Sequence, residues 1–181
     1  MLTVTPTEKF ERRFCRPREG RTLIVGSHIY GGKEDRRKRY ANAWGVDMLA
    51  GPGVDVVADL EDWGMVTYLL PISGFDHVEC HSVLEHSRRP WLMAENITAL
   101  MAPGATLDLR VPFVWRPHAY PSDYFRYTTE GVRVLFPRID WEGLLYATDT
   151  HLSKVAKLMG LHQDDRVHLA RCEVMGFGVR V

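Results

Sequence analysis

Several residues of this 181-residue chain stand directly after a predicted strand, where open parallel sheets bind their ligands. They are Gly26, Asp47, Asp59, His81 and Pro112. Gly26 lets the backbone approach a ligand closely and adopt a positive φ, which a side chain would hinder. Asp47 stands 21 positions after Gly26, and a carboxylate there can accept hydrogen bonds from both hydroxyls of a ribose. The spacing therefore predicts a ribose-binding edge.

A second acidic residue, Asp59, precedes Leu60 at the end of the third predicted strand. From there a side-chain oxygen could accept a hydrogen bond from an adenine amino group. For Asp47 and Asp59 alike, an exposed loop carboxylate without a ligand is the alternative. The loop GSHIYGGK after the first strand contains neither G-x-G-x-x-G nor a P-loop. Its sequence argues against pyrophosphate or triphosphate binding and also fits an ordinary tight turn.

Three residues near the predicted strand ends could accept a proton, namely His86, His118 and Asp123. His86 could equally be a histidine at the start of a helix with a satisfied hydrogen bond. Cys80 and His81 would add possible metal ligands, but the separation of His81 and His86 by five positions does not place both on one helical face. We therefore expect no metal.

The stretch 115–127, WRPHAYPSDYFRY, mixes aromatic and charged side chains after the fifth predicted strand. It follows a strand end, where the mouth of an active site is expected, so we predict that it binds the substrate. The residues assigned to this role are Trp115, His118, Tyr120, Asp123 and Arg126. The alternative is a structured surface loop whose aromatic rings pack on the sheet.

Short apolar and β-branched runs bounded by turn residues predict the strands that position these side chains. The predicted strands are 22–25, 44–47, 54–58, 75–80, 106–111, 141–148 and one within 172–181. The predicted helices are a short one before residue 44, followed by 61–70, 91–101, 129–136 and 152–159. Alternating strands and helices predict a doubly wound α/β fold in one domain. We expect a mostly parallel, Rossmann-like sheet of seven strands with an antiparallel last strand.

The composition limits the kinds of partner. Acidic and basic residues each number 23, so no net field draws the chain to nucleic acid, and the basic runs 12–21 and 36–39 fit solvated helix faces. Residues 1–21 are predicted to form an arm or helix that leads into the domain at 22–181. The three cysteines form no C-x-x-C pair, and no apolar run is long enough to span a bilayer. We expect a cytoplasmic protein without a membrane partner.

A series of sequence motifs follows along the chain: LIVGS, a strand ending in GVD, GPGVDVVADL, FDHVECHSVLEH, APGATLDLRVPF and HAYPSDYFRYTTEGVRVL. This order resembles the class I S-adenosylmethionine-dependent methyltransferases, and among them the type 11 group. The resemblance covers residues 20–136 and is most specific at VLEH (83–86) and at P-x-D-Y-F-R-Y-T (121–128). It departs in the loop, where the family has alternating glycines and this chain has Ser27, His28 and Ile29 before its two glycines.

The resemblance implies S-adenosylmethionine as cofactor and assigns residues to each part of it. They are Gly26, Ser27, Asp47, Asp59, Leu60, His81 and Ser82. The first two match the loop against the methionine part, and Asp47 matches the acid that binds the ribose. The next two match the adenine contact, and the last two match the segment that faces the sulfonium.

The expected function is methyl transfer from S-adenosylmethionine to a small-molecule acceptor. One alternative is a non-catalytic binding or interaction module in which the cofactor loop has degenerated. A nicotinamide oxidoreductase would share the sheet and the ribose-binding acid, but the missing G-x-G-x-x-G argues against it. A nucleic-acid methyltransferase is disfavoured by the balanced charge and by the absence of an Asn-Pro-Pro-aromatic motif.

Overall fold

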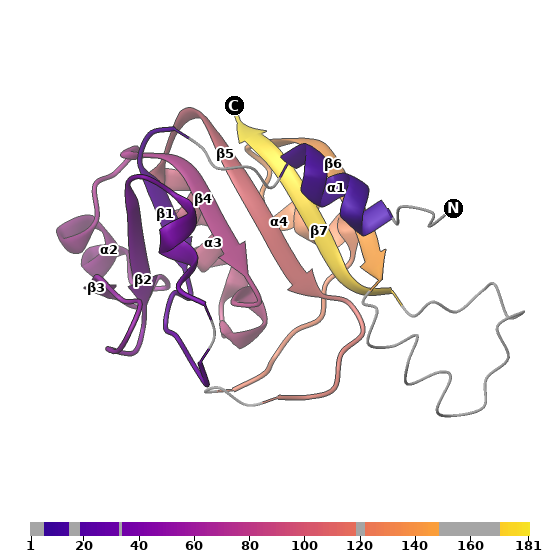
Figure 1. Cartoon of the computed structure of the whole chain (residues 1–181), viewed down its shortest axis with the longest axis horizontal. Helices are drawn as coiled ribbons and strands as arrows, with labels where there is room; N and C mark the ends of the chain where they lie inside the picture. Colours follow the sequence, from indigo (N-terminus) through magenta and orange to yellow (C-terminus); the bar gives the residue numbers. More distant parts are fainter. Residues whose placement is uncertain (1–5, 15–18, 33, 119–121, 149–170) are drawn as a thin grey trace, which may run out of the picture.

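The computed structural model of the chain describes residues 6–14, 19–32, 34–118, 122–148 and 171–181. Its centre is a seven-stranded sheet in the order β3-β2-β1-β4-β5-β7-β6 (Figure 1). The strands are β1 (Thr22–Val25), β2 (Ala43–Asp47), β3 (Val56–Val57), β4 (Phe75–His81), β5 (Met101–Pro112), β6 (Ile139–Thr148) and β7 (Arg171–Arg180). The predicted seven-stranded α/β fold is confirmed.

The five strands from β3 to β5 are parallel, as expected. Strand β1 lies between β2 and β4, and its last residue, Val25, pairs with both Val46 and Cys80. Every residue of β1 is buried, which explains why its sequence is a short run without alternation. The carboxyl ends of β1, β2 and β4 therefore meet at one edge of the sheet.

Strand β7 is antiparallel to both of its neighbours, so the prediction for the last strand is confirmed. It lies between β5 and β6, and its residue Gly176 pairs with Leu109 on one side and with Leu144 on the other. The two antiparallel pairings add β7 and β6 beside β5, on the side of the sheet away from β1 and β2, which precede Gly26 and carry Asp47.

Helices cover both faces of the sheet. They are α1 (Pro6–Phe14), α2 (Trp63–Leu69), α3 (Pro90–Leu100), α4 (Thr129–Leu135) and the two 3-10 helices η1 (Arg36–Arg39) and η2 (Leu84–His86). Figure 1 shows α1 across the near face of β6 and β7, with α3 and α4 behind the sheet. Side chains of Asp62 and Thr128 accept backbone N–H groups at the starts of α2 and α4. These helices and α3 match the predictions at 61–70, 129–136 and 91–101.

Helix α1 is held by aromatic packing. Phe10 and Phe14 are buried together with Met175 and Phe177 of β7, and the rings of Phe14 and Phe177 stack with centroids 4.8 Å apart. A Cβ at Gly143 of β6 would lie 2.9 Å from the Phe14 ring, so the glycine leaves room for it. The predicted N-terminal arm thus contains a helix that completes the core over the antiparallel strands.

One connection and one strand differ from the sequence-based predictions. In its described part, the crossover from β1 to β2 holds only the basic 3-10 helix η1, which begins where the Asp35 side chain accepts the N–H of Arg37. Strand β3 is shorter than the predicted 54–58, because this edge strand pairs with β2 at Val56 and Val57 only. The helix predicted at 152–159 lies outside the described residues. In the part of the chain that the structure describes, no helix is long and apolar enough to cross a membrane.

Candidate functional site

The loop after β1 touches both neighbouring strand ends. The N–H groups of Gly26 and Ser27 donate to the carbonyl oxygen of Val46, at 2.9 and 3.2 Å. Gly26 has a φ of 66°, and a Cβ there would lie 2.4 Å from a methyl group of Val83. A larger residue at this position would meet both backbone strain and a clash. The glycine therefore lets the loop lie against the segment that follows β4.

The hydroxyl of Ser27 faces inward. Ser27 is buried, and a Cβ added to Gly45 of β2 would lie 2.6 Å from its Oγ. The side chain therefore points toward β2, so a ligand at the sheet edge would meet the backbone of Ser27. The two following glycines, Gly31 and Gly32, have positive φ values and open space where a Cβ would stand.

Asp47 is oriented by the backbone on both sides. The N–H of His28 donates to Oδ2 at 3.1 Å, and the N–H of Leu49 donates to Oδ1 at 3.0 Å. The ionised carboxylate has about four acceptor positions, so each oxygen keeps capacity for another donor. The loop is also tied to the end of β2, because the N–H of Ile29 donates to the Pro52 carbonyl oxygen at 2.8 Å.

An arginine that the sequence reasoning missed holds this loop by hydrogen bonds to its backbone. Arg36 of η1 donates through Nη1 to Glu79 Oε1 of β4 at 2.8 Å, and through Nη2 to the carbonyl oxygens of Val25 and Gly26 at 3.1 and 2.7 Å. The Glu79 side chain is only 2% exposed, and its second oxygen accepts the Tyr40 hydroxyl at 2.9 Å. Arg36 belongs to a run of basic residues that resembled a solvated face, so no sequence signal distinguished it.

The segment after β3 is fixed by turn and core contacts. Asp59 Oδ1 accepts the N–H of Glu61 at 2.8 Å. Leu60, which the family resemblance assigned to adenine, is 3% exposed and packs in the main core, while its carbonyl oxygen accepts the Asn96 amide at 2.8 Å. The side chain of Leu60 is buried in the core, where an apolar group is most stable, so it does not face the edge of the sheet. Any contact of Leu60 with adenine would have to come from its backbone.

Glu61 clasps the turn that leads into α3. Its Oε1 accepts the hydroxyl of Ser87 and the N–H of Arg88, each at 2.8 Å, and its Oε2 accepts Nε of Arg89 at 2.9 Å. Burial alone would raise the pKa of Glu61, but these hydrogen bonds outweigh it and hold the pKa below its usual value. The clasp joins the segment after β3 to the segment after β4.

At the end of β4, the His81 side chain lies against two carboxylates and does not face the open edge of the sheet. Its Nε2 lies 3.0 Å from Asp108 Oδ1, and its Nδ1 lies 3.6 Å from Glu79 Oε1. The next residue, Ser82, has a φ of 54°, an uncommon value for a residue with a side chain. Ser82 is exposed and its N–H donates to the Arg110 carbonyl oxygen at 2.9 Å. Of the two residues assigned to the sulfonium end, Ser82 is the one that stands open.

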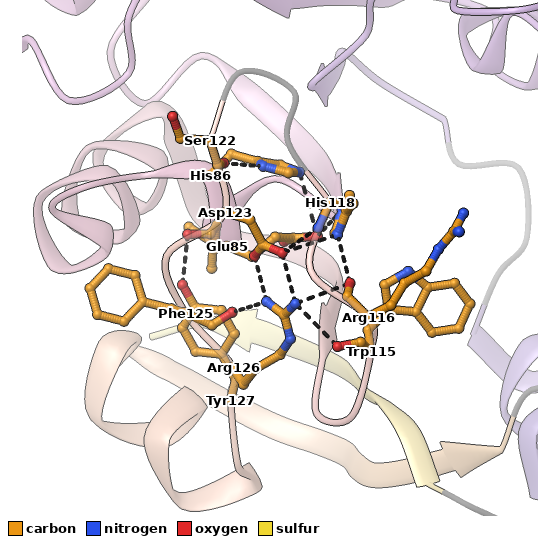
Figure 2. A network of polar contacts seen from close by, with 11 residues as sticks. Glu85, His86, Trp115, Arg116, His118, Ser122, Asp123, Phe125, Arg126 and Tyr127 are labelled. Carbon is orange, nitrogen blue, oxygen red and sulfur yellow. Dashed lines mark hydrogen bonds and ion pairs between the residues drawn. The ribbon is translucent and has the colours of Figure 1, made fainter.

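The structure brings Glu85, His86 and His118 together in a network shown in Figure 2. Nε2 of His86 lies 3.8 Å from Glu85 Oε1, and Nε2 of His118 lies 3.9 Å from the same oxygen. The two imidazole rings meet edge to face, with centroids 4.9 Å apart. Of the three, the sequence reasoning missed Glu85 as a site residue, although it stands inside the VLEH motif directly before His86.

Glu85 is deeply buried. It is 1% exposed, and burial raises the pKa of its carboxyl group to about 7. Helix η2, which carries it, is held by the hydroxyl of Tyr127, which donates to the Leu84 carbonyl oxygen at 2.6 Å. The N–H of Tyr124 donates to the carbonyl oxygen of Glu85 at 2.8 Å. The segment after β5 thus fixes the segment after β4.

Asp123 is engaged by two partners. Its carboxylate pairs with the Arg126 guanidinium at 2.5 and 2.8 Å and accepts the N–H of His118 at 2.8 Å. The Arg126 bond is the main reason why the pKa of Asp123 lies far below its usual value. Such a carboxylate is a weak base, which disfavours Asp123 as the proton acceptor among the three candidates.

Arg126 ties together two parts of the segment that follows β5, where the sequence predicts the substrate to bind. The Arg126 guanidinium donates to the carbonyl oxygens of Phe125, Trp115 and Arg116 at 2.7, 3.3 and 3.3 Å, as Figure 2 shows. The side chain of Trp115 is exposed. Tyr120, the fifth residue predicted for the substrate, lies outside the described residues.

No protein-family model and no curated protein matches the sequence. The fold nevertheless resembles many solved structures. A methyltransferase in complex with the Trm112 activator from Haloferax volcanii aligns with a TM-score of 0.67 and 14% identity over 96% of this chain and 88% of that one. The 1,6-didemethyltoxoflavin-N1-methyltransferase of Burkholderia thailandensis, solved with S-adenosylhomocysteine, aligns with a TM-score of 0.62 and 13% identity over 96% and 75%.

The same fold also carries other chemistry. The [4+2]-cyclase SpnF aligns with a TM-score of 0.62 and 12% identity over 96% of this chain and 79% of that one. The chain therefore has the fold of the class I S-adenosylmethionine-dependent methyltransferases, and its function has to be argued from its own site.

Proposed function

We propose that this protein is an S-adenosylmethionine-dependent methyltransferase that acts on a small molecule. The observation that carries the proposal is the placement of Asp47, whose carboxylate is aimed by two backbone N–H groups beside the Gly26 turn in a sheet of this topology. In sheets of this kind an acid at the end of the second strand can take the ribose hydroxyls of a bound nucleoside.

The residues at the strand ends fit such a cofactor. Asp47 retains acceptor capacity for two hydroxyl donors, and Gly26 offers backbone without a side chain to the methionine part. Asp59 follows β3, and its Oδ1 accepts the N–H of Glu61. The carboxylate keeps capacity to accept a further hydrogen bond from an adenine amino group. When bound, the cofactor would supply a sulfonium methyl group, whose carbon the acceptor would attack in line with the departing thioether sulfur.

The acceptor molecule is expected to bind between the segments that follow β4 and β5. His86 and His118 lie near the carboxyl ends of β4 and β5, and either Nε2 can take the proton of an acceptor hydroxyl. An amine or thiol acceptor that is already nucleophilic would need orientation alone. Trp115 and Arg126 come from the same segment and are the residues expected to contact the acceptor.

A small acceptor is favoured over a nucleic acid because the chain carries no net charge. The Burkholderia thailandensis neighbour, an N1-methyltransferase solved with 1,6-didemethyltoxoflavin, provides an example of a small acceptor on this fold. A non-catalytic binding module remains the second candidate, since the loop after β1 departs from alternating glycines and lies against the end of β2.

Calorimetry with S-adenosylmethionine, S-adenosylhomocysteine and a nicotinamide dinucleotide tests the proposal. We expect binding of the first two, and we expect Asp47→Ala to weaken it about 10- to 100-fold, or about 1.4–2.8 kcal/mol, because ribose hydroxyls lose their acceptor. Asp140→Ala is the matched control, since Asp140 is exposed and lies near the start of β6, at the opposite edge of the sheet. Binding of the dinucleotide alone would refute the proposal.

A further inference from the structure

We propose that Glu85, His86 and His118 form a binding site for one divalent transition-metal ion of the zinc class. One ligand atom from each residue lies within 4.8 Å of the others. Both imidazole Nε2 atoms approach the same carboxylate oxygen, at 3.8 and 3.9 Å. In a tetrahedral zinc site with bonds of about 2.0–2.2 Å, neighbouring ligand atoms are about 3.4 Å apart, so each of these two distances would have to shorten by about half an ångström.

The histidine protons are already placed for metal binding. Nδ1 of His86 lies 2.6 Å from the carbonyl oxygen of Ser122, which can only accept, so this nitrogen carries the proton and Nε2 keeps a lone pair. Nδ1 of His118 lies 3.4 Å from the carbonyl oxygen of Arg116 and 3.3 Å from Asp123 Oδ2, and both of these oxygens favour the same tautomer. Histidines that bind metals in proteins commonly donate their other N–H to a carbonyl or carboxylate oxygen in this way.

The carboxylate supplies an independent observation. Glu85 is 1% exposed, and its Oε2 has no hydrogen-bond donor among the residues that the structure describes. A buried polar atom without a partner is costly, and a buried carboxylate is usually paired with a cation or coordinated to a metal. The nearby guanidinium of Arg126 is bonded to Asp123 and to backbone carbonyl oxygens, so it does not fill this role for Oε2.

The donor set defines the class of ion. Two neutral imidazoles and one carboxylate favour Zn²⁺, Co²⁺, Ni²⁺ or Fe²⁺ over Mg²⁺ and Ca²⁺, which prefer oxygen ligands. With the ion bound, both Nε2 atoms are ligands and no longer accept a proton, and three protein ligands leave a coordination position for water or for an oxygen of a bound molecule. That the bound oxygen belongs to the methyl acceptor rests on the proposed function, whereas the metal site itself does not.

A second cluster with similar residue types argues by contrast. Glu79, His81 and Asp108 also bring ligand atoms within 4.8 Å of one another. There, however, Arg36 is bonded directly to Glu79 Oε1 at 2.8 Å, so the carboxylate that would bind the ion already has its cation. We therefore assign the metal to the Glu85 cluster and use the His81 cluster as an internal control.

The test uses the full chain without a histidine tag, stripped of metal by a chelator. Zinc chloride is titrated by calorimetry, and cobalt chloride is titrated with detection of the visible absorption of a four-coordinate Co²⁺ ion. We expect one ion per chain, bound at least 100-fold more weakly by Glu85→Gln and by His118→Gln. Asp123→Asn should weaken binding 10- to 100-fold through the orientation of His118. His81→Gln should leave the affinity unchanged.

The outcomes separate the site from the function. His118 is partly exposed, so His118→Gln should remain folded, and circular dichroism verifies this for each variant. Equal zinc affinity in wild type, Glu85→Gln and His118→Gln would overturn the site, as would no binding to the wild type. Zinc binding without binding of S-adenosylmethionine would leave the metal site standing and refute the methyltransferase proposal, and the reverse result would do the opposite.

Discussion

Arg36 and Glu79 form an ion pair at 2.8 Å beneath the loop that follows β1, and the same guanidinium also holds the carbonyl oxygen of Gly26 at 2.7 Å. The 3-10 helix η1 is the only helix in the described part of the crossover between β1 and β2. Arg36 therefore fixes the loop by side-chain hydrogen bonds at a place where a longer crossover helix would do so by packing. Arg36 thus adds a side-chain support to the candidate cofactor loop, beside the backbone hydrogen bonds that tie Gly26, Ser27 and Ile29 to the end of β2.

Replacing Arg36 by methionine should lower the free energy of unfolding by about 3 kcal/mol, because it leaves the buried carboxylate of Glu79 without its cation. Urea denaturation measures the change. Arg39→Met is the control, since the Arg39–Glu34 pair is exposed and should contribute less than about 1 kcal/mol. The double variant Arg36→Met with Glu79→Gln should recover part of the loss. Equal effects of the two single variants would contradict the role of Arg36.

Gly26→Ala should both destabilise the fold and weaken binding of S-adenosylmethionine. The left-handed backbone costs about 1–2 kcal/mol for a residue with a Cβ, and the added atom would lie 2.4 Å from Val83. Gly31→Ala separates the two causes, because Gly31 has a φ of 58° but open space around it. Thermal unfolding and calorimetry on both variants should show a larger loss for Gly26. If Gly31→Ala reduced cofactor affinity as much, the contact with Val83 would be irrelevant.

The sheet could be predicted because its strands are short apolar runs bounded by turn residues. Strand β1 matches its predicted bounds, since all of its side chains are buried and its sequence has no competing period. Strand β3 could not be bounded, because hydrogen bonding to β2 at an edge, and not the residue types of 54–58, decides where it ends.

The site was predicted in parts. The position of Asp47 follows from strand ends that share an edge, which the sequence encodes as strand followed by acid. The meeting of Glu85 with His118 depends on how the connection after β5 folds back on η2, a contact between residues 33 positions apart that no periodicity reveals. Arg36 was hidden for a related reason, since an arginine that pairs with a buried carboxylate and a fully solvated one have the same neighbours in sequence.

Glu61→Gln should remove part of the acid sensitivity of the protein. Hydrogen bonds in the folded state lower the pKa of Glu61, so the stability it contributes is full above its unfolded pKa of about 4.3 and is lost as pH falls through the lower folded value. The variant should be about 1–2 kcal/mol less stable at pH 7, with a flatter decline below pH 4. Urea melts over a pH series give both values. Glu95→Gln, at an exposed position of α3, should leave the profile as it is in the wild type.

Phe14→Ala tests whether α1 belongs to the core or is a detachable arm. The ring is buried against Phe177 and Phe10, so its removal should cost about 3–5 kcal/mol through lost burial and the cavity that remains. Lys9→Ala on the exposed face of the same helix should change stability by less than about 0.5 kcal/mol. Chemical denaturation followed by tryptophan fluorescence compares the two. A cost below 1 kcal/mol for Phe14→Ala would mean that α1 docks too weakly to stabilise β6 and β7, and the arm could then be removed without loss of the sheet.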